Sequence, residues 1–206
     1  MTLVKICGLM RPEDVEAVNR FRPDYAGFVF AKSRRQVAPE HARRLIARLD
    51  PVIVPVGVFV DESVETVAAI AGLCRLGAVQ LHGSEDNSYI SSLRKLLPPD
   101  VIVIQAVRVR DAASLVVTEQ SFCDLLLLDA CAEGVAGGAG QTFDWRLLEG
   151  FSKPYLLAGG LRGGNVAEAV RKLKPLGVDV SSGVETDGNK DYDKIGRFIE
   201  LARGGN

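Results

Sequence analysis

The chain has 206 residues, 47% of them hydrophobic, and a net charge of −1 at pH 7. This near-neutral balance gives no general electrostatic reason to expect a nucleic acid or an anionic membrane surface as partner, and no apolar run reaches the roughly 18 residues of a membrane span. The four cysteines lack CxxC spacing, which argues against a zinc site and a disulfide framework. We therefore expect a globular cytoplasmic protein with reduced thiols.

Short apolar runs alternate with segments of helical period along the whole chain. The runs predict strands near residues 3–7, 24–30, 52–59, 77–81, 101–106, 124–129, 154–158 and 177–181. Helices are predicted near residues 12–21, 39–49, 63–74, 86–97, 111–119, 144–149, 163–173 and 190–202. The first helix is expected to begin at Pro12, because its missing N–H has no intrahelical partner at that position.

Eight strand–helix pairs in a chain of this length leave no room for a second domain. Several runs, such as Leu125 to Leu128, are apolar throughout, which is typical of parallel strands covered on both faces. These features predict one domain over residues 1–206, a closed (β/α)8 TIM barrel of the α/β class. A doubly wound open sheet is the alternative, disfavoured because no glycine-rich nucleotide turn follows the first strand.

Active groups in such a barrel lie at the carboxyl ends of the strands, and Cys7 ends the first of them. A thiolate can act as a base or a nucleophile. Lys5 lies two residues earlier, on the same strand face, and could supply the positive charge that favours a thiolate. The alternative is a cysteine that packs as a small hydrophobe and a lysine that pairs with a barrel carboxylate.

Two acids lie in later strands. Asp129 ends a strand of four leucines, where desolvation favours a protonated carboxyl that can donate a proton to a substrate oxygen. Its alternative role is to fix the following loop. Asp179 lies within a predicted buried strand, where an unpaired carboxylate is unfavourable, so it either pairs with Lys5 or hydrogen-bonds a substrate.

Glycines and serines in neighbouring loops indicate a phosphate site. Gly159 and Gly160 follow the seventh strand, and Ser181-Ser182-Gly183 follow the eighth. Barrels often bind phosphate there, through backbone N–H groups and the N-terminus of a short extra helix. Gly138 and Gly140, after the sixth strand, are expected to add a close-fitting flap over the phosphate.

Basic side chains follow the second and fourth strands. An arginine at position 34 or 35 could clamp a carboxylate with two parallel hydrogen bonds, although a solvated basic loop is the alternative for Arg34. His82 is either catalytic or a structural hydrogen-bonding residue.

The order and spacing of several segments resemble the phosphoribosylanthranilate isomerase family. These segments are Lys5-Ile6-Cys7-Gly8, Gly27-Phe28-Val29-Phe30 with Ser33-Arg34-Arg35, Val56-Gly57-Val58-Phe59-Val60, Gln80-Leu81-His82-Gly83, Leu128-Asp129, Thr142-Phe143-Asp144-Trp145, Ala158-Gly159-Gly160-Leu161 and Asp179-Val180-Ser181-Ser182-Gly183-Val184-Glu185. The family is a (β/α)8 barrel, so the resemblance and the strand pattern imply the same fold.

The resemblance implies an isomerase of tryptophan biosynthesis that catalyses the Amadori rearrangement of N-(5-phosphoribosyl)anthranilate to 1-(2-carboxyphenylamino)-1-deoxyribulose 5-phosphate. It implies that Cys7 is the general base at ribose C2 and Asp129 the general acid at the furanose ring oxygen. Arg35, a better match than Arg34, would hold the anthranilate carboxylate, and we assign His82 and Asp179 to substrate binding. The only partner implied is this small phosphosugar–anthranilate molecule, with no cofactor and no metal, and we expect a monomer or a homodimer.

Two alternatives remain. A non-catalytic phosphosugar-binding barrel would need the phosphate loops but neither Cys7 nor Asp129. A related aminoaldose–ketose isomerase with a different substrate usually carries an acidic residue where Cys7 stands.

Overall fold

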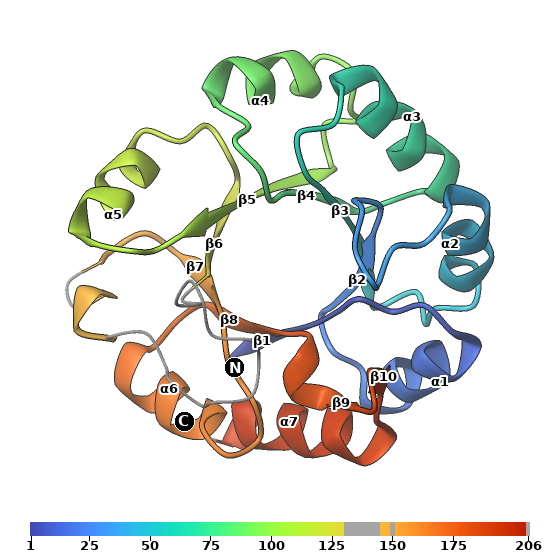
Figure 1. The fold of residues 1–206 in the computed structure, drawn as a ribbon, viewed down its shortest axis with the longest axis vertical. Coiled ribbons are helices and arrows are strands. Elements are labelled where there is room, and N and C mark those ends of the chain that lie inside the picture. Colours follow the sequence, from blue (N-terminus) through green and yellow to red (C-terminus); the bar gives the residue numbers. More distant parts are fainter. Residues whose placement is uncertain (130–144, 149–150, 205–206) are drawn as a thin grey trace.

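Eight parallel strands close into one barrel in a computed structural model of the protein, which describes residues 1–129, 145–148 and 151–204. The strands pair in chain order and the eighth returns to the first, while the helices form a ring around them (Figure 1). The predicted (β/α)8 barrel is thereby confirmed, and the open sheet is excluded. No helix in the described part of the chain is long and apolar enough to cross a membrane.

The barrel strands lie close to their predicted positions. They are β1 (Leu3–Cys7), β2 (Tyr25–Val29), β3 (Val54–Phe59), β4 (Ala78–Leu81), β5 (Ile102–Arg108), β6 (Leu125–Asp129), β7 (Tyr155–Ala158) and β8 (Gly177–Val180). The α-helices are α1 (Pro12–Phe21), α2 (Pro39–Ile46), α3 (Val64–Cys74), α4 (Asn87–Arg94), α5 (Ala112–Glu119), α6 (Val166–Leu173) and α7 (Tyr192–Gly204).

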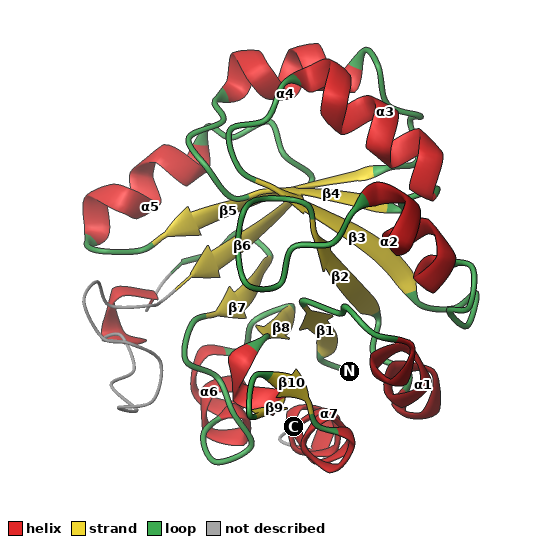
Figure 2. Ribbon diagram, turned by 45° about the vertical axis from the view of Figure 1, so that its right-hand side comes forward, coloured by secondary structure: helices red, strands yellow, loops and turns green. Residues whose placement is uncertain are grey.

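The structure differs from the sequence prediction in several places, including the end of α4 at Arg94 and the start of α6 at Val166. Helix α2 ends at Ile46, three residues early, because the N–H groups of Arg48 and Leu49 bond to carbonyls three residues back instead of four. In place of the helix near 144–149, the described residues form a 3₁₀ turn, η1 (Trp145–Leu148). After β8, the chain forms a second 3₁₀ turn, η2 (Ser182–Val184), and an unpredicted hairpin, β9 (Glu185–Thr186) and β10 (Asn189–Lys190). Figure 2 shows this hairpin beside α7.

Two cores show which way each strand residue points. One consists of strand residues alone and fills the barrel; the other joins the outer strand faces to the helices. In β6, Leu125 and Leu127 belong to the inner core, while Leu126 and Leu128 belong to the outer one. Because side chains alternate along a strand, Asp129 must continue the inner face.

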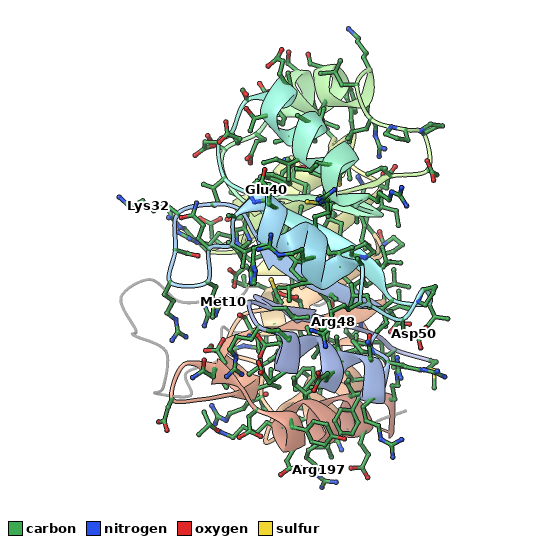
Figure 3. All side chains as sticks on the ribbon, turned by 90° about the vertical axis from the view of Figure 1, so that its right-hand side faces the viewer. Met10, Lys32, Glu40, Arg48, Asp50 and Arg197 are labelled. Carbon is green, nitrogen blue, oxygen red and sulfur yellow. The ribbon has the colours of Figure 1, made fainter. Side chains whose placement is uncertain are left out.

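The two ends of the barrel differ in what they carry. In the side view of Figure 3, Met10 and Lys32 lie at one end, in loops that follow strands, and Asp50 lies at the other, in a loop that precedes a strand. The carboxyl ends of all eight parallel strands therefore meet at the end marked by Met10 and Lys32.

Candidate active site

Strand alternation gathers polar side chains at the carboxyl end of the barrel. Cys7, Gln80, Asp129 and Asp179 each continue the inner face of their strand, since their neighbours in sequence pack outward against the helices. All four line one cavity of about 420 Å³. Cys7 and Asp129 therefore line the same cavity, although 122 positions separate them in the sequence.

The cavity also collects the other predicted site residues that the structure describes. These are Arg35, His82, Gly159, Gly160, Ser181, Ser182 and Gly183. Gly138 and Gly140, predicted to cover the phosphate, lie outside the described residues. The residues that were predicted from their positions after strand ends therefore do lie around one cavity.

Cys7 is buried at the tip of β1, and charged groups surround it. Lys5, on the same face, is fully buried, and its Nζ donates to Asp179 Oδ1 at 2.8 Å. Burial disfavours the Lys5 ammonium, but Asp179 and the Cys7 thiol favour it, and the net effect is a raised Lys5 pKa. Lys5 is therefore held in its charged form beside the Cys7 thiol.

Of the two roles expected for Asp179, the pair with Lys5 is present. The residues are direct neighbours in the register of β1 and β8. Asp179 nevertheless lines the cavity, so the pair does not remove its carboxylate from reach of a ligand.

His82 links Asp129 to a buried amide. Gln80 Nε2 lies 2.9 Å from His82 Nδ1, and His82 Nε2 faces Asp129 Oδ2 at 3.5 Å. With the Gln80 amide assigned in this orientation, it donates to Nδ1, which leaves the imidazole proton on Nε2, toward Asp129. Gln80 was not singled out from the sequence, although its place two residues before His82 puts both on one strand face.

The loops after β7 and β8, for which phosphate binding is predicted, both line the cavity. Gly159 and Gly160 have φ of +91° and +63°, a left-handed backbone that glycine adopts without strain. A side chain at Gly183 would overlap the Leu161 carbonyl oxygen, so only glycine lets these loops approach. The turn η2 begins at Ser182, and both Ser182 and Gly183 line the same cavity.

Arg35 has an intramolecular partner that the sequence did not predict. Its Nε and Nη2 donate to Glu185, whose side chain is 6% exposed and also accepts from Arg34 and Lys190. Burial raises the pKa of Glu185, but the hydrogen bonds from Arg35 and Lys190 outweigh it and lower that pKa to about 2. Burial lowers the pKa of Lys190, against the opposing effect of Glu185. Glu185 ends the last segment of the family resemblance, which was the signal available for it.

The described residues offer no group of side chains suited to a metal ion. Within residues 1–129, 145–148 and 151–204, no three His, Cys, Asp or Glu side chains cluster as metal ligands would.

Comparisons with known proteins agree on one family. The sequence pattern of N-(5'phosphoribosyl)anthranilate (PRA) isomerase matches residues 4–201. The chain is 50% identical to N-(5'-phosphoribosyl)anthranilate isomerase of Acetivibrio thermocellus, over 98% of this chain and 96% of that protein. It is 46% identical to the enzyme of the same name from a Thermoanaerobacter species, over 99% of both.

Solved structures of that family share the fold. The crystal structure of phosphoribosyl anthranilate isomerase from Thermotoga maritima superposes with a TM-score of 0.88 at 38% identity, over 99% of this chain and 100% of that one. Another, at 37% identity and a TM-score of 0.84 over the same shares, is a complex with reduced 1-(o-carboxyphenylamino)-1-deoxyribulose 5-phosphate.

Proposed function

The chain belongs to the N-(5'-phosphoribosyl)anthranilate isomerase family, and on that premise we propose that Cys7 and Asp129 are the base and the acid of its reaction. The activity is an isomerisation in tryptophan biosynthesis. Its substrate is N-(5-phosphoribosyl)anthranilate and its product 1-(2-carboxyphenylamino)-1-deoxyribulose 5-phosphate.

Asp129 begins the reaction. Its protonated carboxyl donates to the furanose ring oxygen, the bond from that oxygen to the anomeric carbon breaks, and the anthranilate nitrogen becomes part of a charged imine. His82, which faces this carboxyl at 3.5 Å, keeps it turned toward the cavity. The inner-face position of Asp129 supports this role, because no apolar side chain of β6 separates it from a ligand.

Cys7 completes the reaction. Its thiolate removes the proton from ribose C2, and the electron pair of that C–H bond neutralises the imine to give the enol form of the product. Lys5, held charged by Asp179, stabilises the thiolate during this step. The scheme requires the acid and the base to hold opposite protonation states at neutral pH.

Binding groups anchor both ends of the substrate. The loops around Gly159, Gly160 and residues 181–183 hold the phosphate, while Arg35 holds the anthranilate carboxylate. Asp179 contacts the substrate near its amine. Gly138 and Gly140 would cover the phosphate. No cofactor takes part in this scheme.

The observation that carries the proposal is the single cavity shared by Cys7, Asp129 and the phosphate loops. The test follows anthranilate fluorescence with phosphoribosylanthranilate as substrate. Cys7→Ala and Asp129→Ala should each lower kcat by about 10²–10⁴-fold while phosphate-dependent binding of the reduced product analogue stays intact. Retained turnover in either variant would refute its role, and a non-catalytic phosphosugar-binding barrel would show no turnover even with the unchanged chain.

We further propose a single domain that works in the cytoplasm as a monomer or a homodimer. A structural relative from Thermotoga maritima is described as dimeric. Light scattering coupled to size exclusion would give the mass in solution, and a trimer or larger assembly would contradict the proposal.

A further inference from the structure

Resting on the proposed role of Arg35, we propose that Glu185 is a positioning residue that fixes which edge of the Arg35 guanidinium faces the cavity. Glu185 does not itself line the cavity, whereas Arg35 does. Its influence on a ligand must therefore pass through the arginine.

The geometry of the pair assigns the two edges. Arg35 Nε donates to Glu185 Oε1 at 2.7 Å, and Arg35 Nη2 donates to Oε2 at 3.0 Å. A guanidinium carries five N–H donors in one plane, and this fork uses the side edge. The end edge, formed by Nη1 and the second hydrogen of Nη2, makes no hydrogen bond to another described residue and can take a second carboxylate.

Glu185 can hold this orientation because it is itself held. Lys190 Nζ donates to Oε1 at 2.8 Å, and Arg34 Nη2 donates to Oε2 at 2.7 Å. Glu185 and Lys190 pair across the antiparallel hairpin β9–β10, and the Lys190 side chain is 2% exposed. The carboxylate therefore cannot rotate without breaking buried charged contacts.

The same lysine ties the arginine to the phosphate loop. Lys190 Nζ donates to the Ser181 carbonyl oxygen at 2.9 Å, and Ser181 Oγ donates to the Cys7 carbonyl oxygen at 3.0 Å. The charge cluster of Arg34, Arg35, Glu185 and Lys190 thus joins the loop after β2 to the loop after β8. Its three cations surround one carboxylate. The charge cluster therefore keeps a net positive charge, which suits a ligand that carries both a phosphate and a carboxylate.

The consequence is preorganisation. A free arginine samples many rotamers, and a ligand carboxylate would have to order it on binding. With Glu185 in place, the guanidinium is already held in one orientation beside the cavity before a ligand binds. Loss of Glu185 should therefore weaken binding of ligands that carry the carboxylate and leave other ligands nearly unaffected.

The experiment compares two stable probes by calorimetry: the reduced product analogue and its counterpart that lacks the ortho-carboxyl group. In Glu185→Gln, we expect the dissociation constant of the first to rise about tenfold, the size of one lost charge-assisted hydrogen bond, and that of the second by less than about twofold. Glu200→Gln is the matched control, because it makes the same change in an exposed glutamate that pairs with Arg197 on α7, away from the cavity, and should leave both constants unchanged. Equal weakening of the two probes in Glu185→Gln, or no weakening, would overturn the proposal.

Arg35→Ala separates this inference from the proposed function. If Arg35→Ala leaves discrimination between the probes intact, the carboxylate role of Arg35 is wrong; if it removes discrimination while Glu185→Gln does not, only the positioning role is wrong. Should Glu185→Gln not fold, because Lys190 is left buried without its anion, Lys190→Met and the double variant Glu185→Gln/Lys190→Met replace it. The double variant should then lose discrimination relative to Lys190→Met, and equal discrimination in the two would contradict the inference.

Discussion

Replacing Lys5 by methionine should destabilise the barrel far more than the loss of a surface ion pair would. Lys5 is fully buried, 2.8 Å from Asp179, at the point where β8 closes on β1. Lys5→Met leaves the Asp179 carboxylate in the barrel without its cation. Removing one partner of a buried pair costs about 3–5 kcal/mol. For a domain of this size, that corresponds to a fall in Tm of roughly 6–20 °C.

Urea unfolding of four proteins tests this reasoning: the unchanged chain, Lys5→Met, Asp179→Asn and the double variant. Because the penalty comes from a charge left alone, the double variant should be more stable than the sum of the single losses predicts. Lys172→Met is the control. It breaks an exposed pair with Glu168 on α6 and should cost no more than about 0.5 kcal/mol. A Lys5→Met loss as small as that of the control, or strictly additive losses, would refute the account of the barrel interior.

Three further predictions concern the cavity and its supports. Gly183→Ala should raise KM and cost about 1–3 kcal/mol of stability, because its Cβ would overlap the Leu161 carbonyl. Gly72→Ala is the control and should do neither, because a Cβ at Gly72 meets open space. Measurements of KM and of the free energy of unfolding check both variants, and equal behaviour of the two would count against the prediction. Because folding lowers the pKa of Glu185 from 4.5 to about 2, its contribution to stability should be complete above pH 4.5 and disappear as pH falls toward 2. The free energy of unfolding should therefore depend less steeply on pH in Glu185→Gln than in the unchanged chain across this range. The same pH dependence in both proteins would contradict the assignment. Gln80→Leu should lower kcat by up to about 100-fold with stability almost unchanged, because His82 loses the donor that fixes its ring beside Asp129. Steady-state kinetics give kcat, and the urea midpoint gives the stability. An unaltered kcat would exclude a role of Gln80 in positioning His82.

Local patterns made much of the barrel predictable. Strand runs bounded by turn residues located all eight strands, and Pro12 marked the start of α1. The rule that active groups follow strand ends then placed Cys7, Asp129 and the residues near 159 and 182 at one mouth, where a common cavity joins them. Family membership, predicted from the motifs, is confirmed by the comparisons.

The charge cluster at the barrel mouth escaped prediction because it depends on long-range folding. Glu185 and Lys190 have the composition of a solvated surface segment, and the predicted last helix began at Lys190. Their side chains are buried because the hairpin pairs Lys190 with Glu185, and Glu185 bonds Arg35, which lies 150 positions earlier in the chain. No periodicity in the sequence encodes that contact. The same holds for Gln80, whose partner His82 was visible but whose burial was not.

The most direct test of the central claim is the kinetic isotope effect of substrate deuterated at ribose C2, measured in single turnovers of Cys7→Ser and Asp129→Asn. If Cys7 removes that proton, its weakened replacement makes C–H cleavage limiting, and a full primary isotope effect should appear in Cys7→Ser. If Asp129 opens the ring, Asp129→Asn makes the preceding step limiting, and its isotope effect should fall to near unity. The reverse pattern, or the same isotope effect in both variants, would contradict the division of acid and base between these two residues.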